Sequence, residues 1–170
     1  MSDTSRQSGF TIVELMVTLA VAAILMGFAV PAFNDFVRQR TAASHINDFV
    51  LAVTYARSEA ARRGVNVSLE ARGNENDNEW GEGYDVMVDP GGADEEILRS
   101  FEAVADGFTM NAVGNGWDGE DRLTYSPRGL ITPQPPNPGQ IQLCHETEDP
   151  GRVVNVTVIG RPDVEELTCN

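Results

Sequence analysis

Residues 9–33 read G-F-T-I-V-E-L-M-V-T-L-A-V-A-A-I-L-M-G-F-A-V-P-A-F, and one carboxylate, Glu14, stands at the edge of this apolar run. Residues 15–33 carry no charge, and only Thr18 among them is polar. A helix rises about 1.5 Å per residue, so these residues span about 30 Å, the thickness of a bilayer core. The stretch therefore predicts a membrane-spanning helix.

The segment before this run, residues 1–8, is short and hydrophilic and leads to Gly9. A secretory signal peptide has a shorter apolar part, with small residues at a cleavage site after it. Ala-Val-Pro-Ala at 29–32 matches such a site poorly, so the junction between Gly9 and Phe10 is the more informative boundary. The alternative is an ordinary signal anchor with Glu14 at the membrane interface, which leaves that junction unexplained.

The residues G-F-T-I-V-E-L at 9–15, together with Pro31, resemble the N-terminal segment of type IV pilins and type II secretion pseudopilins. The resemblance implies cleavage after Gly9 by a prepilin peptidase, N-methylation of Phe10, a helix bend at Pro31 and a role for Glu14 in assembly. A carboxylate in an apolar segment costs about 2.5–3.5 kcal/mol unless it finds a partner. The amine that cleavage creates at Phe10 of a neighbouring subunit is the partner we expect.

Past Pro31 the apolar residues recur at three- and four-residue steps, which indicates an amphipathic helix with one buried face. These residues are Phe33, Phe36, Val37, Ile46, Phe49, Val50, Val53, Ala56 and Ala60. Gly64 follows Arg62 and Arg63 as a helix stop with basic residues in the last turn. We therefore predict one helix over residues 10–63.

Beyond Gly64 the hydrophobic period becomes two, which is typical of half-buried strands. About seven short antiparallel strands are predicted, drawn from 65–72, 80–89, 95–101, 108–113, 122–126, 130–132, 140–145 and 152–159. No strand is predicted in the acidic tail, 160–170. The fold class is α+β and pilin-like, with the long helix packed on a small antiparallel β-sheet.

Four segments follow from these patterns. They are a prepilin leader (1–9), a transmembrane or filament-core helix (10–33), its amphipathic continuation (34–63) and a β-rich head (64–170). The resemblance places the chain in the bacterial inner membrane as a single-pass protein with a periplasmic head, and then in a pilus or pseudopilus at the cell surface. Arg6 in the leader favours a cytoplasmic N-terminus.

The head is strongly acidic. The formal net charge of the 170 residues is −14, and residues 64–170 hold six Arg against twenty-one Asp and Glu, a net of −15. Such a surface repels nucleic acid and anionic lipid headgroups.

Both cysteines, Cys144 and Cys169, lie in the head. In an oxidising compartment we expect them to form a disulfide, which contributes about 3.5 kcal/mol in the chain-entropy model. Two free thiols are the alternative.

Several head segments resemble the GspH/FimT/FimU group of minor pilins and pseudopilins. They are A-R-S-E-A at 56–60 with Gly64, the residues Trp80, Gly83 and Tyr84, the stretch 123–129, and the Gly-Arg pairs at 151–152 and 160–161. The resemblance implies a non-enzymatic minor type IV pilin in a priming or tip complex, with other minor and major pilins as partners. The alternative is a GspH-like pseudopilin of type II secretion; the two cysteines look more like FimT and FimU.

A third hypothesis is a FimT-like pilin that takes up DNA through a basic G-R-x-R tail. Here Asp163 stands in place of the second arginine, and Glu165 and Glu166 follow. These carboxylates remove the attraction that dominates DNA affinity, so the sequence disfavours nucleic-acid binding.

An enzyme is also disfavoured. His45 and His145 are the two histidines, and neighbouring Cys144 and His145 would point to opposite faces of a strand. No nucleophile elbow, phosphate loop or zinc-protease motif occurs, so no catalytic residue or cofactor is predicted. The acidic loops 74–79 and 118–121 offer oxygen ligands for Ca²⁺, but neither has EF-hand spacing, and solvated loops are the preferred interpretation.

Overall fold

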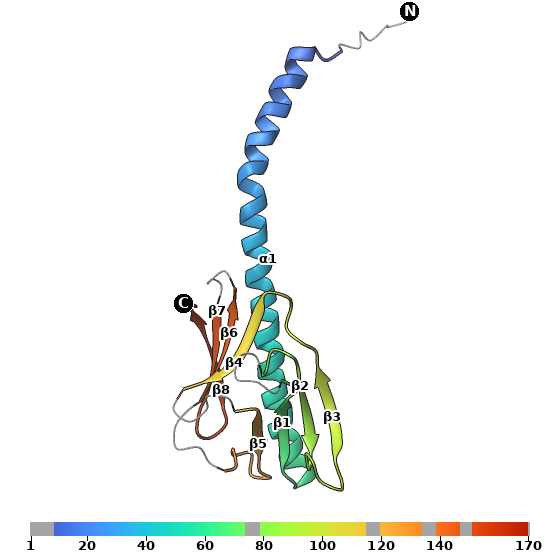
Figure 1. The fold of residues 1–170 in the computed structure, drawn as a ribbon, viewed down its shortest axis with the longest axis vertical. Helices are drawn as coiled ribbons and strands as arrows, with labels where there is room; N and C mark the ends of the chain where they lie inside the picture. Colours follow the sequence, from blue (N-terminus) through green and yellow to red (C-terminus); the bar gives the residue numbers. More distant parts are fainter. Residues whose placement is uncertain (1–8, 74–78, 115–119, 134–138, 147–150, 170) are drawn as a thin grey trace, which may run out of the picture. The chain divides into compact units, whose positions relative to one another are not determined.

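The computed structural model describes residues 9–73, 79–114, 120–133, 139–146 and 151–169 (Figure 1). Within these residues one helix is followed by eight strands. They are α1 (Ile12–Arg63), β1 (Val67–Ala71), β2 (Tyr84–Val88), β3 (Glu96–Phe101), β4 (Phe108–Val113), β5 (Arg122–Tyr125), β6 (Gly139–His145), β7 (Gly151–Val156) and β8 (Pro162–Leu167). The chain divides into two compact units, Met1–Arg38 and Gln39–Asn170, and α1 contributes to both. The predicted α+β class is confirmed.

The helix ends where its sequence predicts. Gly64 has a φ of 72°, a left-handed conformation that glycine adopts without strain, and its amide donates to the Ala60 carbonyl at 3.0 Å. Arg62 and Arg63 occupy the last turn, where cations interact favourably with the helix dipole. At the other end α1 begins at Ile12, two residues later than predicted.

The strands form two antiparallel sheets rather than one. The first has the order β3-β2-β1-β5 and the second β4-β6-β7-β8. The first two strands after α1 are antiparallel neighbours, because β1 pairs β2 in the register Val67 to Val88 and Ala71 to Tyr84. Strands β6 and β7 are also antiparallel neighbours, with Ile141 opposite Val154.

Two details of the strand prediction were wrong. Residues 130–132 make one isolated bridge, between Ile131 and Tyr125, because the preceding turn is closed by the Ser126 amide on the Leu130 carbonyl at 2.8 Å. The acidic tail contains β8, an edge strand that pairs with β7 over its whole length. Its four central residues are exposed, so it lacks the apolar alternation that marks a half-buried strand.

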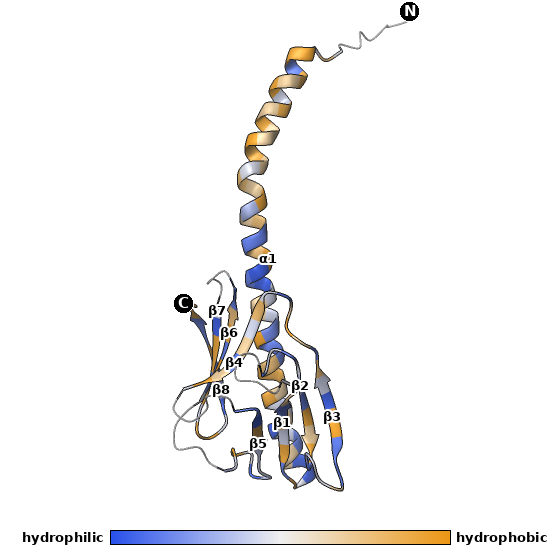
Figure 2. Cartoon of the chain, viewed as in Figure 1, coloured by the Kyte–Doolittle hydropathy of each residue, from blue (hydrophilic) through white to orange (hydrophobic). Residues whose placement is uncertain are grey.

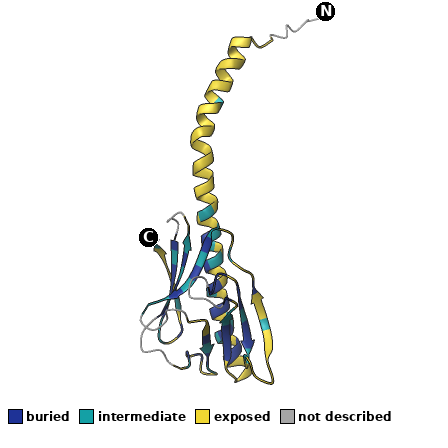
Figure 3. Ribbon diagram, in the orientation of Figure 1, coloured by how far each residue is buried: buried dark blue, intermediate teal, exposed yellow. Residues whose placement is uncertain are grey.

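The core lies between the second half of α1 and the two sheets (Figure 3). The helix contributes the buried residues Ala42, Ile46, Phe49, Ala52, Val53, Ala56 and Ala60. At its centre the Phe49 ring meets Trp80 edge-on, with centroids 5.4 Å apart, and meets Tyr84 at 5.5 Å. Such pairs add about 0.5–1.5 kcal/mol beyond the area that they bury. The predicted amphipathic continuation is therefore a core helix from Ala42 to Ala60, whereas Phe33, Phe36 and Val37, which were predicted on the same buried face, are exposed.

The A-R-S-E-A segment places an anchoring carboxylate at the end of α1. Glu59 is buried and accepts hydrogen bonds from Arg62 and Arg63, which lower the pKa of its carboxyl to about 2. Arg63 also donates to Glu96 at 2.6 Å. The helix end is thus tied to the first residue of β3.

Candidate assembly site

The helix α1 begins with a reciprocal pair of hydrogen bonds. The Glu14 amide donates to Thr11 Oγ1 at 3.2 Å, and the Thr11 amide donates to Glu14 Oε2 at 3.2 Å. The Thr11 hydroxyl also donates to that carboxylate oxygen, at 3.2 Å. This is a capping box, in which Thr11 precedes the helix and Glu14 is its third residue. It explains why α1 begins at Ile12, and the signature Thr-x-x-Glu at 11–14 could have predicted it.

The cap uses one side of the Glu14 carboxylate. Oε2 accepts the hydrogen bonds from Thr11, whereas Oε1 has no hydrogen-bond partner in the described parts of the chain. An ionised carboxylate accepts about four hydrogen bonds. Glu14 therefore keeps acceptor capacity for a donor outside its own helix.

Gly9 and Phe10 precede the helix and are accessible. Phe10 is 86% exposed, and apart from its chain neighbours no described residue lies within 4 Å of the position that a Cβ on Gly9 would take. A peptidase could therefore reach the bond between them. Cleavage there and methylation of Phe10 stay predictions.

The first part of α1 is mostly apolar along its length (Figure 2). One window of 18 residues has a mean hydropathy of 2.3, and none of it is buried by the rest of the chain. Its polar residue, Thr18, donates its hydroxyl to the Leu15 carbonyl at 2.8 Å and so exposes little hydrogen-bonding capacity. By length and composition this helix is able to cross a membrane. Pro31 lies inside α1, and the bend expected there stays a prediction.

The disulfide expected in the head is present. Cys144 on β6 is bonded to Cys169 beyond β8, with the Cα atoms 5.9 Å apart, so the bond fastens the C-terminal edge strand to the middle of its sheet. Gly151 faces this bond, and a Cβ there would collide with Cys169 Sγ and with the Leu167 carbonyl. The glycine of the first Gly-Arg pair is therefore required by packing.

The second Gly-Arg pair, at 160–161, leads into a charged strand. Asp163, Glu165 and Glu166 are exposed on β8, and Glu166 accepts from Arg152 at 3.0 Å. Gly160 itself packs against Tyr125, whose hydroxyl donates to the Gly160 carbonyl at 3.1 Å. The edge of this sheet is therefore acidic where a DNA-binding tail would be basic.

The cysteine and histidine pair does not form a catalytic arrangement. Cys144 is in the disulfide, and the His145 ring stacks edge-on against Phe108 with centroids 4.8 Å apart. No group of three or more His, Cys, Asp or Glu side chains suited to a metal occurs among the residues that the structure describes.

The two acidic loops considered for Ca²⁺ lie largely outside the described residues, which include only 79 and 120–121 of them. Glu79 is buried, and its Oε1 accepts from the Ala112 amide at 2.7 Å. The Glu120 carbonyl accepts from Trp80 Nε1 at 2.8 Å. These contacts join the loops to β4 and to the core.

Two family models match the chain. The model described as type II transport protein GspH matches residues 45–160, and the model described as the prokaryotic N-terminal methylation motif matches residues 4–30. The second match includes residues 9–15, G-F-T-I-V-E-L, but not Pro31.

Solved structures share the fold. The type IV minor pilin FimU of Pseudomonas aeruginosa PAO1 is similar with a TM-score of 0.63 and 23% identity, over 79% of this chain and 99% of that one. The minor pseudopilin EpsH of the type 2 secretion system of Vibrio cholerae is similar with a TM-score of 0.51 and 10% identity, over 75% of this chain and 96% of that one.

Curated relatives match over a short segment. Type IV major fimbrial protein FimA of Dichelobacter nodosus is 44% identical over 43 residues, which are 25% of this chain and 27% of FimA. Another FimA of Dichelobacter nodosus is 52% identical over 33 residues, or 19% of this chain and 21% of that protein. The chain thus matches little more than a quarter of the length of these relatives.

Proposed function

The chain belongs to the GspH family, and we propose that within this family of pilin-like structural subunits it acts as a minor type IV pilin. It joins a pilus priming or tip complex through α1 and carries out no catalysis. The observation that supports this role best is the position of Glu14, which lies on the first turn of an exposed apolar helix and keeps one carboxylate oxygen available.

Assembly would begin with removal of the leader. Cleavage after Gly9 by a prepilin peptidase creates an amine at Phe10, which is then methylated. The Glu14 carboxylate lies in an apolar surface, where a charge without a partner costs about 2.5–3.5 kcal/mol. An amine from the Phe10 position of a neighbouring subunit pairs with Glu14 Oε1 and offsets this cost, while Oε2 stays on the Thr11 cap.

The proposed location is the inner membrane, with α1 spanning it once and the head in the periplasm, followed by transfer into the filament. The disulfide supports a head outside the cytoplasm, because disulfides persist in oxidising compartments. Arg6 supports a cytoplasmic leader. The partners are other minor and major pilins.

A second candidate is a minor pseudopilin of type II secretion. The name of the matching family model and the fold shared with EpsH favour it. The two cysteines and the N-terminal similarity to FimA favour the pilus.

Deleting the gene distinguishes a minor pilin from a pseudopilin of type II secretion. Loss of surface pili with unchanged protein secretion, restored by the full chain, is the result expected of a minor pilin. Loss of secretion with normal pili would refute the pilus assignment and support the pseudopilin. A strain that keeps both activities would refute both roles.

A further inference from the structure

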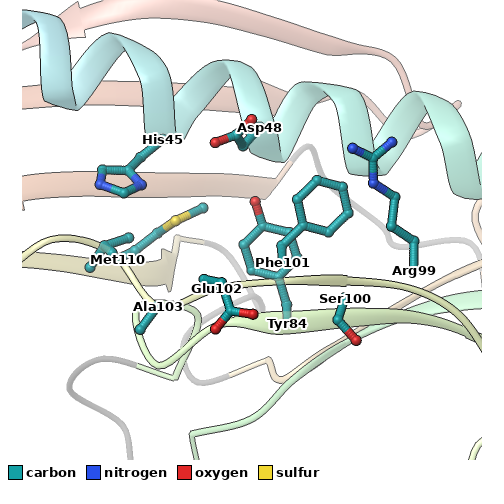
Figure 4. A pocket seen from close by; sticks show the side chains of 10 residues that line it. His45, Asp48, Tyr84, Arg99, Ser100, Phe101, Glu102, Ala103 and Met110 are labelled. Carbon is teal, nitrogen blue, oxygen red and sulfur yellow. The ribbon is translucent and has the colours of Figure 1, made fainter.

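A cavity of about 220 Å³ lies in the second unit, between α1 and the segment that joins β3 to β4 (Figure 4). The side chains that line it include His45 and Asp48 from α1, Tyr84 from β2, Arg99 and Phe101 from β3, and Met110 from β4. This volume would hold about seven water molecules at liquid density, enough for the end of a long side chain.

The Tyr84 hydroxyl points into this cavity without a partner. Tyr84 is 3% exposed, and its ring is enclosed by Phe49, Trp80 and Phe101. Its hydroxyl forms no hydrogen bond with any described residue, and Figure 4 shows it directed toward the helix that carries Asp48. Among the described residues, the fully enclosed side-chain atoms without a partner belong to Glu70, Glu79, Asn111 and Arg152. The Tyr84 hydroxyl is therefore open to the cavity and available to a ligand there.

The Asp48 carboxylate lies on the helix that the Tyr84 hydroxyl faces. Asp48 lies one helix turn after His45, is exposed, and forms no ion pair with any described residue. Burial raises the pKa of Tyr84, and the Asp48 carboxylate raises it further, so the hydroxyl stays protonated. A carboxylate beside a neutral hydroxyl provides acceptors for a cationic donor.

The other lining groups tolerate a cation. His45 Nε2 accepts a hydrogen bond from the Ala105 amide at 3.0 Å, which requires a neutral imidazole. Burial lowers the pKa of His45, against the effect of Asp48. The Arg99 guanidinium lies 4.8 Å from the centroid of the Phe101 ring, which holds it in a cation–π contact. Its charge opposes a second cation, and the carboxylates of Asp48 and Glu102 in the same lining outweigh it.

We propose that this cavity binds the cationic side chain of a lysine or arginine presented by a different subunit of the same filament. The ammonium or guanidinium group lies between Asp48 and the Tyr84 hydroxyl. The chain contains no lysine, and residues 64–170 carry a net charge of −15, so two copies of this head repel each other and the donor belongs to a less acidic protein. The presence of a neighbouring subunit rests on the proposed function.

Binding is tested on the full chain in detergent micelles with ¹³C-labelled methionine methyl groups. Met110 lines the cavity, and Met87, buried on β2 outside the lining, reports on the fold. The probes are Nα-acetyl-lysine amide and Nα-acetyl-arginine amide. We expect either probe to shift the Met110 signal saturably and to leave Met87 unchanged.

Matched variants locate the interaction. Asp48→Asn weakens binding about tenfold, the loss expected for one charge-assisted hydrogen bond, and Tyr84→Phe weakens it about threefold or more. Asp106→Asn removes an equal charge outside the lining and leaves binding unchanged. An unchanged Met87 signal in each variant shows that the fold is intact.

Three outcomes would overturn the proposal. They are no saturable shift of Met110, an equal shift with neutral Nα-acetyl-norleucine amide, and a shift with Nα-acetyl-glutamate amide, which would make Arg99 an anion site. Glu102 also lines the cavity, so a photo-crosslinking amino acid placed at position 102 in cells identifies the subunit that supplies the cationic side chain. Capture of a different pilin supports the proposal, whereas capture of a second copy, or of no subunit, contradicts the proposed donor. The titration does not depend on filament assembly, so its failure leaves the minor pilin role intact.

Discussion

The Glu14 carboxylate and the Thr11 amide are joined at 3.2 Å, so the residue predicted to pair with a neighbouring subunit also caps its own helix. The two roles are compatible because the cap uses Oε2 and leaves Oε1 available. A cap of this kind contributes about 1 kcal/mol and fixes the direction of the side chain. Glu14 therefore does not have to be ordered anew when a partner arrives.

Replacing Glu14 by alanine should prevent filament incorporation without preventing membrane insertion. Insertion becomes easier, because a charge that costs about 2.5–3.5 kcal/mol is removed. Incorporation loses a charge-assisted hydrogen bond of about 1.5–3 kcal/mol, so we expect the sheared filament fraction to contain at least tenfold less protein. The measurement is immunoblotting of the filament and membrane fractions. Asp35→Asn, which removes a carboxylate on α1 beyond the apolar run, is the control. Normal incorporation of Glu14→Ala would refute the role of Glu14.

The mature protein should begin with N-methylated Phe10. The bond after Gly9 is accessible, and the N-terminal methylation model matches residues 4–30. Mass spectrometry of the protein purified from membranes checks the terminus directly, and the Gly9→Val variant should keep its leader. A mature terminus at any other residue would contradict the leader assignment.

Removing the disulfide should destabilise the head. Cys144 and Cys169 are 25 residues apart, and a loop of this length corresponds to about 3.5 kcal/mol in the chain-entropy model. We expect the double variant Cys144→Ala, Cys169→Ala to unfold at lower urea concentration, as followed by tryptophan fluorescence of the full chain in detergent. A reducing agent should lower the stability of the wild type and leave that of the variant unchanged. Two alkylatable thiols in the unreduced protein would contradict the bond.

Acid should destabilise the head through His45. Its Nε2 accepts from the Ala105 amide, and burial lowers its pKa below the ordinary value of 6.5. The unfolded chain therefore binds a proton at a higher pH than the native chain, so this contribution to stability is complete above about pH 6.5 and is lost as the pH falls through the native pKa. His45→Gln should flatten the slope of unfolding free energy against pH in this window, and His145→Gln is the control. If the slope of unfolding free energy against pH is the same in His45→Gln as in the wild type, His45 does not cause the loss of stability in acid.

The elements that could be predicted are those whose signals are local. Strands β1 and β2 follow from alternation along neighbouring segments, and the end of α1 follows from Gly64. The division into two sheets depends instead on distant pairings, such as β1 with β5, which no local pattern specifies. Strand β8 is recognisable only by its pairing with β7. The cavity at Tyr84 could not be predicted from the sequence either, because its lining residues come from four separate elements.

The second Gly-Arg pair should be needed for packing rather than for DNA. Gly160 has a φ of 75°, and a Cβ there would collide with the Tyr125 ring and crowd Ile131. Gly64 provides a matched comparison, because its φ of 72° is similar but, in the described part of the chain and apart from its sequence neighbours, no atom lies within 4 Å of its Cβ position. Backbone strain alone should lower the free energy of unfolding of the Gly64→Ala variant by about 1 kcal/mol.

The free energy of unfolding of Gly160→Ala should fall by about 2–4 kcal/mol, because overpacking adds about 1–3 kcal/mol to the same backbone strain. Urea unfolding of both variants measures the difference, and equal losses would show that the contact with Tyr125 contributes nothing. The wild type should also fail to shift DNA in a gel at low salt, since Asp163, Glu165 and Glu166 follow the pair. A salt-sensitive DNA complex would contradict the prediction that the acidic residues after the pair prevent DNA binding.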